Sequence, residues 1–337
     1  MKTLSMNCWR KTVILFCILT LISCQKKSEH KIALMFPYTT CSRMAIEEQA
    51  FKAKASALNC EAVFTDAQSD EALQRKQAKE LIDQGVDVIV VMAVNAYTAA
   101  EIVREAHAAN VKVIGYDRLI HNCDLDFYIS HNNYDVGKLM AEYALKVRPN
   151  GDYLVLGGDK SDKNAIFVKT GQLETLQPAI KSGNIKIVFD VYVEDWSTDN
   201  AYINMSEYLK LNANNAPDVI LTSYDGLVYG ARKALDEAGI TKDIVITGQD
   251  AEPQALKNIM SGKQTMTIYK PLKALAEKAV ETAVKLANGE QPDTTGSINN
   301  SRKDVPSYLI APVVVDKNNM LETVVKDGII SAAELGL

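Results

Sequence analysis

The chain has 337 residues, a formal net charge of −5 and only 7% aromatic side chains. This length suggests about two domains, and 47% hydrophobic with 23% charged residues is ordinary for a folded globular protein. The negative charge, with no basic cluster after the N-terminus, argues against a nucleic-acid partner, and so does the small number of aromatic residues that could stack on bases.

The N-terminal segment has the pattern of an export signal. A positively charged stretch at residues 2–11 precedes an apolar stretch at 12–22, which is too short to span a membrane. The sequence Leu-Ile-Ser-Cys at residues 21–24 is similar to a bacterial lipobox. It predicts a signal peptide at 1–23, lipidation of Cys24 and a polar tether at 24–30. The alternative is an ordinary signal peptide with an incidental cysteine.

Three cysteines lie beyond the predicted lipidation site: Cys41, Cys60 and Cys123. An odd number cannot form a complete disulfide framework, and no two have the spacing of a zinc site. We expect buried or partly buried thiols, with a Cys41–Cys60 disulfide as the alternative.

The first part of the chain alternates predicted strands and helices. Apolar β-branched runs predict buried strands, and apolar residues three or four apart predict helices. In chain order we expect a strand at 31–36, a helix at 43–58, strand 61–65, helix 70–84, strand 86–92, helix 99–109 and strands 111–114 and 127–130. This alternation predicts a parallel sheet with right-handed crossovers.

The pattern then restarts, which predicts a second lobe of the same kind. The expected elements are helix 134–147, strand 153–156, helix 165–176, strand 185–193, helix 198–211, strand 219–222, helix 227–238, strand 244–247, helix 252–259, strand 264–268 and helix 272–286. The sequence therefore predicts an α/β fold with two similar doubly wound parallel sheets.

Polar side chains follow the predicted strands. Asp117 and Arg118 come just after the strand at 111–114, and open parallel sheets bind ligands at the carboxyl ends of their strands. An aspartate accepts hydrogen bonds and an arginine donates several, which suits a ligand rich in hydroxyl groups. The alternative for this pair is a surface salt bridge in a loop.

Five motifs in order resemble the D-xylose-binding family of sugar receptors, which belong to the ribose- and galactose-binding-like proteins of bacterial ABC importers. The resemblance runs from about Lys31 to the C-terminus. The matching residues are Tyr116-Asp117-Arg118; Asp126-Phe127-Tyr128-Ile129-Ser130 with Asn133; Gly248-Gln249-Asp250-Ala251; Gln264-Thr265-Met266-Thr267 with Tyr269-Lys270-Pro271; and Lys303-Asp304-Val305-Pro306-Ser307.

The resemblance implies the fold of a type I periplasmic binding protein, in which a three-segment hinge joins the two lobes. It places the N-terminal lobe at 31–131 and 270–298, and the C-terminal lobe at 132–269 and 299–337. The chain would then pass between the lobes near 130–133, near 268–271 and near 299–306.

The resemblance also implies a sugar site between the lobes. An unpaired buried hydroxyl costs ~1–3 kcal/mol and charged partners make the stronger hydrogen bonds, so such a site uses charged side chains. An aromatic ring suits the C–H face of the sugar. The candidate ligand-binding residues are Arg43, Asp117, Arg118, Asp162, Asn164, Trp196, Tyr224, Asp250 and Lys270.

Three of these candidates have simpler interpretations. Arg43 could be a solvated charge at a helix terminus, Asn164 could be a helix N-cap, and Trp196 could be a packing residue at a strand end. Asn164 could also serve as cap and ligand contact together.

Four positions depart from the family pattern, and they bear on which sugar is bound. Tyr224 stands where the family has a sugar-contacting asparagine, and Tyr38 stands where it has acidic residues. Met44 replaces a tryptophan and His131 a phenylalanine. We expect these residues at the ligand pocket or its rim.

No catalytic motif accompanies this site. The four histidines, His30, His107, His121 and His131, belong to no H-E-x-x-H motif, and the sequence has no G-x-S-x-G. Aspartates beside arginine and lysine are expected to stay ionised as acceptors, not to act as a glycosidase pair.

The sequence therefore predicts a receptor that is not an enzyme and uses no cofactor or metal. We expect it to be exported to the periplasmic side, anchored to the membrane by lipid, and to deliver a monosaccharide, D-xylose or a related pentose, to an ABC permease. The alternatives are a sugar-sensing receptor for a two-component kinase or chemotaxis system, and an enzyme acting on a pentose. The export signal and the missing basic head argue against a DNA-binding repressor.

Overall fold

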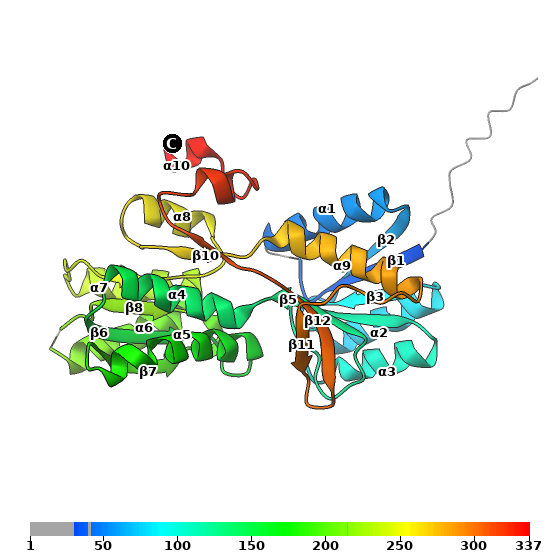
Figure 1. Ribbon diagram of the computed structural model, residues 1–337, viewed down its shortest axis with the longest axis horizontal. Helices are drawn as coiled ribbons and strands as arrows, with labels where there is room; N and C mark the ends of the chain where they lie inside the picture. Colours follow the sequence, from blue (N-terminus) through cyan, green and yellow to red (C-terminus); the bar gives the residue numbers. More distant parts are fainter. Residues whose placement is uncertain (1–29, 40–41, 214) are drawn as a thin grey trace, which may run out of the picture.

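The computed structural model describes residues 30–39, 42–213 and 215–337, and shows two α/β lobes side by side (Figure 1). The predicted signal peptide, Cys24 and Cys41 lie outside these residues, so the structure does not bear on the lipid anchor or on the Cys41–Cys60 disulfide. Cys60 and Cys123 are both buried. Among the described residues, no helix combines the length and the apolar character that a membrane crossing requires.

The first lobe contains a seven-stranded sheet with the order β11-β12-β5-β4-β3-β1-β2. Every neighbouring pair is parallel except β11 and β12. Its strands are β1 (His30–Phe36), β2 (Cys60–Asp66), β3 (Val88–Val91), β4 (Lys112–Tyr116), β5 (Phe127–His131), β11 (Gly296–Asn299) and β12 (Asp304–Ile310).

Helices cover both faces of this sheet, which is why its central strands are continuously apolar. Helices α1 (Ser42–Ala57) and α9 (Leu272–Ala287) pack on one face, where Figure 1 shows α9 beside α1. Helices α2 (Glu71–Asp83) and α3 (Ala100–Ala108) pack on the other. All four residues of β3 are fully buried between these layers.

The second lobe repeats this arrangement with a parallel four-stranded sheet of order β7-β6-β8-β9. One face is covered by α4 and α5, the other by α6 and α7. The elements are α4 (Asn133–Val147), β6 (Gly151–Gly157), α5 (Lys163–Lys181), β7 (Ile185–Tyr192), η1 (Glu194–Trp196), α6 (Thr198–Leu211), β8 (Val219–Thr222), α7 (Asp225–Glu237) and β9 (Val245–Ile246).

A smaller unit completes the second lobe. Strand β10 pairs antiparallel with β13, and residues near the C-terminus pack against α8 in a cluster that includes Leu256, Met320 and Leu335. The elements are α8 (Pro253–Met260), β10 (Thr267–Tyr269), β13 (Val313–Val315), η2 (Leu321–Val325) and α10 (Ala332–Leu335).

The chain passes between the lobes after β5, after β10 and after β12 (Figure 1). The sequence placed the third passage near 299–306, and that placement is wrong. Strand β12 pairs with β5 from Ser307–Tyr128 to Ile310–His131, so residues 299–310 remain with the first sheet. The mostly exposed, polar strand β11 is the reason, because it has the composition of a surface loop.

Candidate functional site

A cavity of about 620 Å³ lies between the lobes, at the carboxyl ends of the strands of both sheets. Its lining includes all nine residues that the sequence proposed as ligand contacts. From the first lobe and its passages come Arg43, Asp117, Arg118 and Lys270, and from the second lobe come Asp162, Asn164, Trp196, Tyr224 and Asp250.

The first-lobe wall contains an arginine shared by two carboxylates. In the first turn of α1, Arg43 Nη2 lies 3.3 Å from Asp117 Oδ1 and 3.0 Å from Glu47 Oε1. Arg43 Nε also donates to Glu47 at 3.0 Å. Two alternatives are therefore wrong: Arg43 is not a solvated terminal charge, and Asp117 does not form a surface salt bridge with Arg118.

Asp117 is held in an uncommon backbone conformation, with a φ of 62°. Its amide donates to the carbonyl of Ile129 at 2.8 Å, and its carbonyl accepts from the hydroxyls of Tyr128 at 2.8 Å and Ser130 at 3.0 Å. All three partners belong to β5. The motif residues Tyr128 and Ser130 therefore hold the strand end that presents the Asp117 carboxylate to the cavity.

The charges around Asp117 keep it ionised. Burial would raise the pKa of this carboxyl, but the positive charge of Arg43, with Lys270 and Arg118 nearby, holds it well below its ordinary value. Glu47 behaves in the opposite way, because burial raises its pKa more than Arg43 lowers it. Of the two carboxylates around Arg43, the one that faces the cavity is the stronger hydrogen-bond acceptor.

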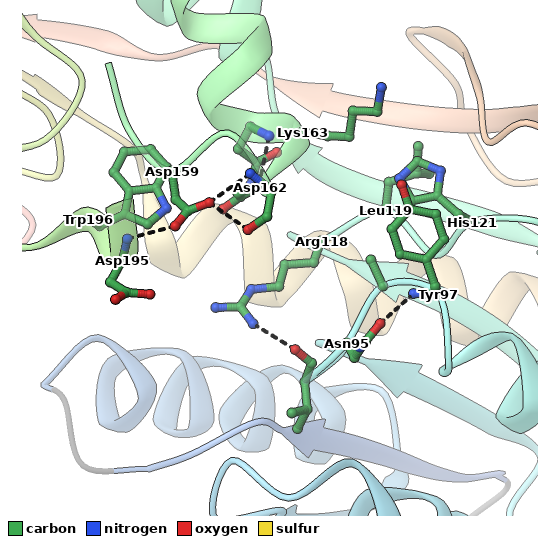
Figure 2. A pocket seen from close by; sticks show the side chains of 14 residues that line it. Asn95, Tyr97, Arg118, Leu119, His121, Asp159, Asp162, Lys163, Asp195 and Trp196 are labelled. Atoms are coloured by element: carbon green, nitrogen blue, oxygen red, sulfur yellow. Dashed lines mark hydrogen bonds between the residues drawn. The ribbon is translucent and has the colours of Figure 1, made fainter. Parts of the chain in front are cut away.

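Arg118 extends from the end of β4 into the space between the lobes. Its Nη1 donates to the carbonyl of Ala93 at 3.0 Å, in the loop after β3. Figure 2 shows its guanidinium between the group formed by Trp196, Asp159 and Asp195 and the stacked pair of Tyr97 and His121. One N–H group thus fixes the side chain, and a planar guanidinium has further donors to offer a ligand.

Asp162 and Asn164 begin helix α5 in the second lobe. Asp162 is the N-cap and accepts from the amide of Asn164 at 2.8 Å, so the interpretation of Asn164 as the cap is wrong. Asn164 instead accepts from Asn133 Nδ2 at 2.9 Å. Burial raises the pKa of Asp162.

Lys270 and Asp250 join the passage after β10 to the loop after β9. Lys270 Nζ lies 2.8 Å from Asp250 Oδ1, and the Lys270 side chain is almost fully buried. Asp250 has a φ of 92°, and its amide donates to the carbonyl of Ile268 at 2.8 Å. This ion pair places a cation and a carboxylate together where the two lobes meet.

Two aromatic rings form the opposite wall. The centroids of Trp196 and Tyr224 are 6.3 Å apart and their planes meet at 85°. Both side chains are half-buried and line the cavity, so Trp196 does not serve only as packing at a strand end.

A second cavity of about 410 Å³ adjoins the first and shares Arg118 and Trp196 with it (Figure 2). On the first-lobe side, Tyr97 stacks on His121 with centroids 4.9 Å apart. On the second-lobe side, Asp159 accepts from the backbone amide of Asp195 at 2.6 Å. The two cavities share lining residues from both lobes, and we call the first the inner cavity and the second the outer chamber.

Three of the four departures from the family pattern line the inner cavity: Tyr38, Met44 and Tyr224. The expectation that His131 would reach the pocket or its rim is wrong. His131 ends β5, is 1% exposed and is absent from the lining of both cavities. Burial and the nearby Lys270 lower its pKa to about 3, so this ring is neutral.

Sequence reasoning missed several residues of the site. Glu47 lies four residues after Arg43 on one helix, a spacing typical of an ion pair, so this signal was present in the sequence. Gln249 belongs to the family motif at residues 248–251 and lines the cavity. Its buried Oε1 has no hydrogen-bond partner within the described residues. Asp195 and Glu252 also line the cavity and had no recognisable signal.

The profile of the periplasmic binding protein domain matches residues 32–291. The chain belongs to the periplasmic binding protein family. It is 38% identical over 318 residues to the D-xylose-binding periplasmic protein of Escherichia coli. The aligned region covers 94% of this chain and 96% of that relative. The protein of the same name from Haemophilus influenzae is 39% identical over 298 residues, covering 88% and 90%.

A solved structure agrees with this fold over nearly the whole chain. It is an ABC transporter solute-binding protein from Clostridium phytofermentans with bound β-D-glucose. The TM-score is 0.81 at 26% identity, with 90% of this chain and 99% of that chain covered. The predicted α/β fold and the family resemblance are thus confirmed, and the protein is a solute-binding receptor and not an enzyme.

Proposed function

We propose that this protein is an exported receptor that binds a pentose, most simply D-xylose, between its lobes and delivers it to an ABC permease. The observation that supports this most strongly is the convergence of nine polar and aromatic side chains from both lobes on one cavity. Relatives named for D-xylose binding, at 38% and 39% identity over most of the chain, support the choice of sugar.

The charges that line the cavity favour a neutral ligand. The three cations of the lining are outnumbered by its carboxylates, so a phosphate or carboxylate ligand would meet net repulsion. A neutral polyol can instead donate to the carboxylates and accept from the cations. The cations are Arg43, Arg118 and Lys270, and the carboxylates are Asp117, Asp162, Asp195, Asp250 and Glu252.

Closure of the lobes is the proposed mechanism. A sugar that contacts Asp117 in one lobe and Asp162 in the other is bound best when both contacts form, so it shifts the population toward the closed state. Lys270 lies on a passage between the lobes, and its pair with Asp250 links ligand contact to the hinge. A permease would then recognise the closed state.

Calorimetric titration of the chain from residue 25 onward, with a panel of pentoses and hexoses, tests this proposal. We expect saturable binding of D-xylose and weaker binding of D-glucose. Tighter binding of a hexose would contradict the choice of a pentose. Absence of binding to every sugar in the panel would contradict the sugar site itself.

The lipid anchor is a separate part of the proposal and rests on the lipobox-like residues 21–24. Two acyl chains give stable membrane anchoring. Replacing the acylated residue, Cys24→Ser, should therefore move the protein from the membrane pellet to the soluble fraction. The matched control is Cys17→Ser, which changes a cysteine inside the apolar stretch and should leave the protein in the pellet. If Cys24→Ser also stays in the pellet, the anchor is not at this residue.

A further inference from the structure

The hydroxyl of Tyr224 is already used by the protein. It donates to Glu252 Oε1 at 2.5 Å, and the hydroxyl of Tyr229 donates to Oε2 of the same carboxylate at 2.8 Å. Tyr224 lies between β8 and α7, Tyr229 on α7, and Glu252 is the N-terminal residue before α8. One carboxylate from a distant part of the chain therefore holds two phenols.

Glycines leave room for the two rings of this wall. A Cβ atom at Gly226 would lie 2.4 Å from a ring carbon of Tyr224, and one at Gly158 would lie 2.1 Å from the ring of Trp196. Each ring therefore packs directly on main chain. For Tyr224, packing on the main chain restricts the ring on one side, and the hydrogen bond to Glu252 restricts its hydroxyl. Loss of that hydrogen bond would leave only the packing to hold the ring.

Glu252 is itself held in place. Its amide donates to Asp225 Oδ2 at 3.0 Å. Asp225 is fully buried and also accepts from Thr267 at 2.9 Å and from Gln264 at 2.9 Å. The anchor of Tyr224 thus rests on a buried network and not on a mobile surface side chain.

We propose that Glu252 is a positioning residue that fixes Tyr224 at a right angle to Trp196, and that this aromatic corner selects sugars whose facing edge carries only C–H groups. The proposal rests on the proposed sugar-binding function and adds what determines selectivity. Because the proton of the Tyr224 hydroxyl is donated to Glu252, the Tyr224 ring presents a sugar with carbon atoms and no free donor. A sugar hydroxyl placed against these ring carbons would lose its water partners without replacement, whereas a CH₂ or CH₃ group would not.

The ligand class follows from this chemistry. Pentopyranoses have a bare CH₂ at C5, and 6-deoxyhexoses have a methyl group beyond it, whereas hexoses carry a hydroxymethyl group. We expect D-xylose and 6-deoxy-D-glucose to bind more tightly than D-glucose. The deoxy sugar separates polarity from size, because its methyl is nearly as large as the hydroxymethyl group. If 6-deoxy-D-glucose binds no better than D-glucose, the corner does not select by polarity and the proposal fails.

The test of Glu252 compares Glu252→Ala with the conservative Glu252→Gln. The alanine variant should reduce the ratio of the D-glucose and D-xylose dissociation constants at least fivefold, because the ring is released. The glutamine variant can still accept from the Tyr224 hydroxyl and should retain most of the ratio. A general loss of stability would weaken both sugars together and leave the ratio unchanged, so the ratio distinguishes positioning from folding.

Fluorescence provides a readout that needs no sugar. Trp196 is the only tryptophan after residue 9, so emission from the processed chain reports on this corner. Glu252→Ala should shift that emission in the sugar-free protein, and Glu252→Gln should not. The matched control is Glu237→Ala, which removes a comparable phenol–carboxylate bond, from Tyr202 at 2.6 Å, at an exposed place outside the cavity.

The outcomes separate the two proposals. If Glu252→Ala leaves both the ratio and the emission unchanged, Glu252 does not position Tyr224. If the wild-type protein binds no sugar, the proposed function fails, while the emission still decides whether Glu252 positions the ring. Should Glu252→Ala not fold, Tyr224→Phe keeps the ring, removes its bond to Glu252 and should give the same shift in emission and ratio.

Discussion

Two parts of the cleft are built from different chemistry: the charged wall around Arg43 in the first lobe, and the aromatic wall of Trp196 and Tyr224, which lies beside Asp162 and Asp250 in the second. On the first-lobe wall, charged groups are paired before any ligand arrives: Arg43 lies between Asp117 and Glu47. On the second-lobe wall, two aromatic rings meet at 85° and the hydroxyl of Tyr224 is bound to Glu252. The charged wall is thus suited to hydrogen-bond any sugar, and the aromatic wall to discriminate between sugars.

This difference has an energetic basis. Groups held in position before binding cost less to order when the ligand arrives, so the charged wall contributes mainly to affinity. The carbon atoms of aromatic rings contact C–H groups but offer no partner to a hydroxyl, so this wall decides which sugars fit. Changing the charged wall should weaken all sugars together, whereas changing the aromatic wall should alter their ranking.

The largest effect is expected on the charged wall, for Arg118→Ala. This side chain is fixed by one bond to the carbonyl of Ala93 and offers its remaining donors to the cavity. Removing one partner of a buried charged hydrogen bond typically costs roughly 2–5 kcal/mol. Titration calorimetry should show every sugar weakened by a similar factor.

The control for Arg118 is Arg232→Ala on helix α7. Arg232 forms an ion pair with Asp236 within one helix, and neither residue lines a described cavity. Sugar binding should be unchanged in this variant. If sugar affinity is also unchanged in Arg118→Ala, this arginine does not contact the sugar and only forms a hydrogen bond to the loop after β3.

Much of the positioning of these walls could be predicted from the sequence. Alternating apolar strands and amphipathic helices imply parallel sheets, and polar residues after parallel strands gather at one edge. Asp117 after β4 is an example, although the rule alone left a surface salt bridge as the alternative, whereas Trp196 after β7 was assigned through the family resemblance.

The partners of those residues could not be predicted in the same way. The carboxylate that holds Tyr224 comes from Glu252, 28 residues further along the chain and before another helix. Which of two neighbouring arginines pairs with Asp117 depends equally on packing between elements. The third passage was misplaced because strand β11 is polar and mostly exposed and so has the composition of a surface loop, although β12 beyond it still pairs with β5.

A smaller effect is expected behind the charged wall, at His131. Its folded-state pKa of about 3 lies below its ordinary value of 6.5, because of burial and the positive charge of Lys270, with Asp117 and Arg43 also facing it. Between these pH values the unfolded chain binds a proton that the folded chain does not, so stability falls as the pH drops. Between pH 7 and pH 5, this one group should lower the free energy of unfolding by about 2 kcal/mol.

His131→Phe should remove that cost. Urea unfolding at pH 7 and pH 5 should show the wild-type protein losing about 2 kcal/mol more than the variant. The control is His107→Phe, because His107 is partly exposed and paired with Asp126 at 2.7 Å. An equal loss in the wild-type protein and in His131→Phe would show that His131 is not held neutral by the fold.

The smallest effect is expected on the aromatic wall, for Tyr224→Asn. A glucose hydroxymethyl group placed against the Tyr224 ring leaves its hydroxyl unpaired, which costs ~1–3 kcal/mol, so the wild-type protein should prefer D-xylose to D-glucose by at least roughly tenfold, ~1.4 kcal/mol. Asparagine is shorter and carries an amide that can pair with the hydroxymethyl group of glucose. The variant should therefore bind both sugars, because the charged wall is intact, with a smaller preference.

Tyr97→Asn is the matched control, since Tyr97 lines only the outer chamber and the preference should not change. Equal or tighter binding of D-glucose by the wild-type protein would contradict the pentose assignment and leave the receptor assignment standing.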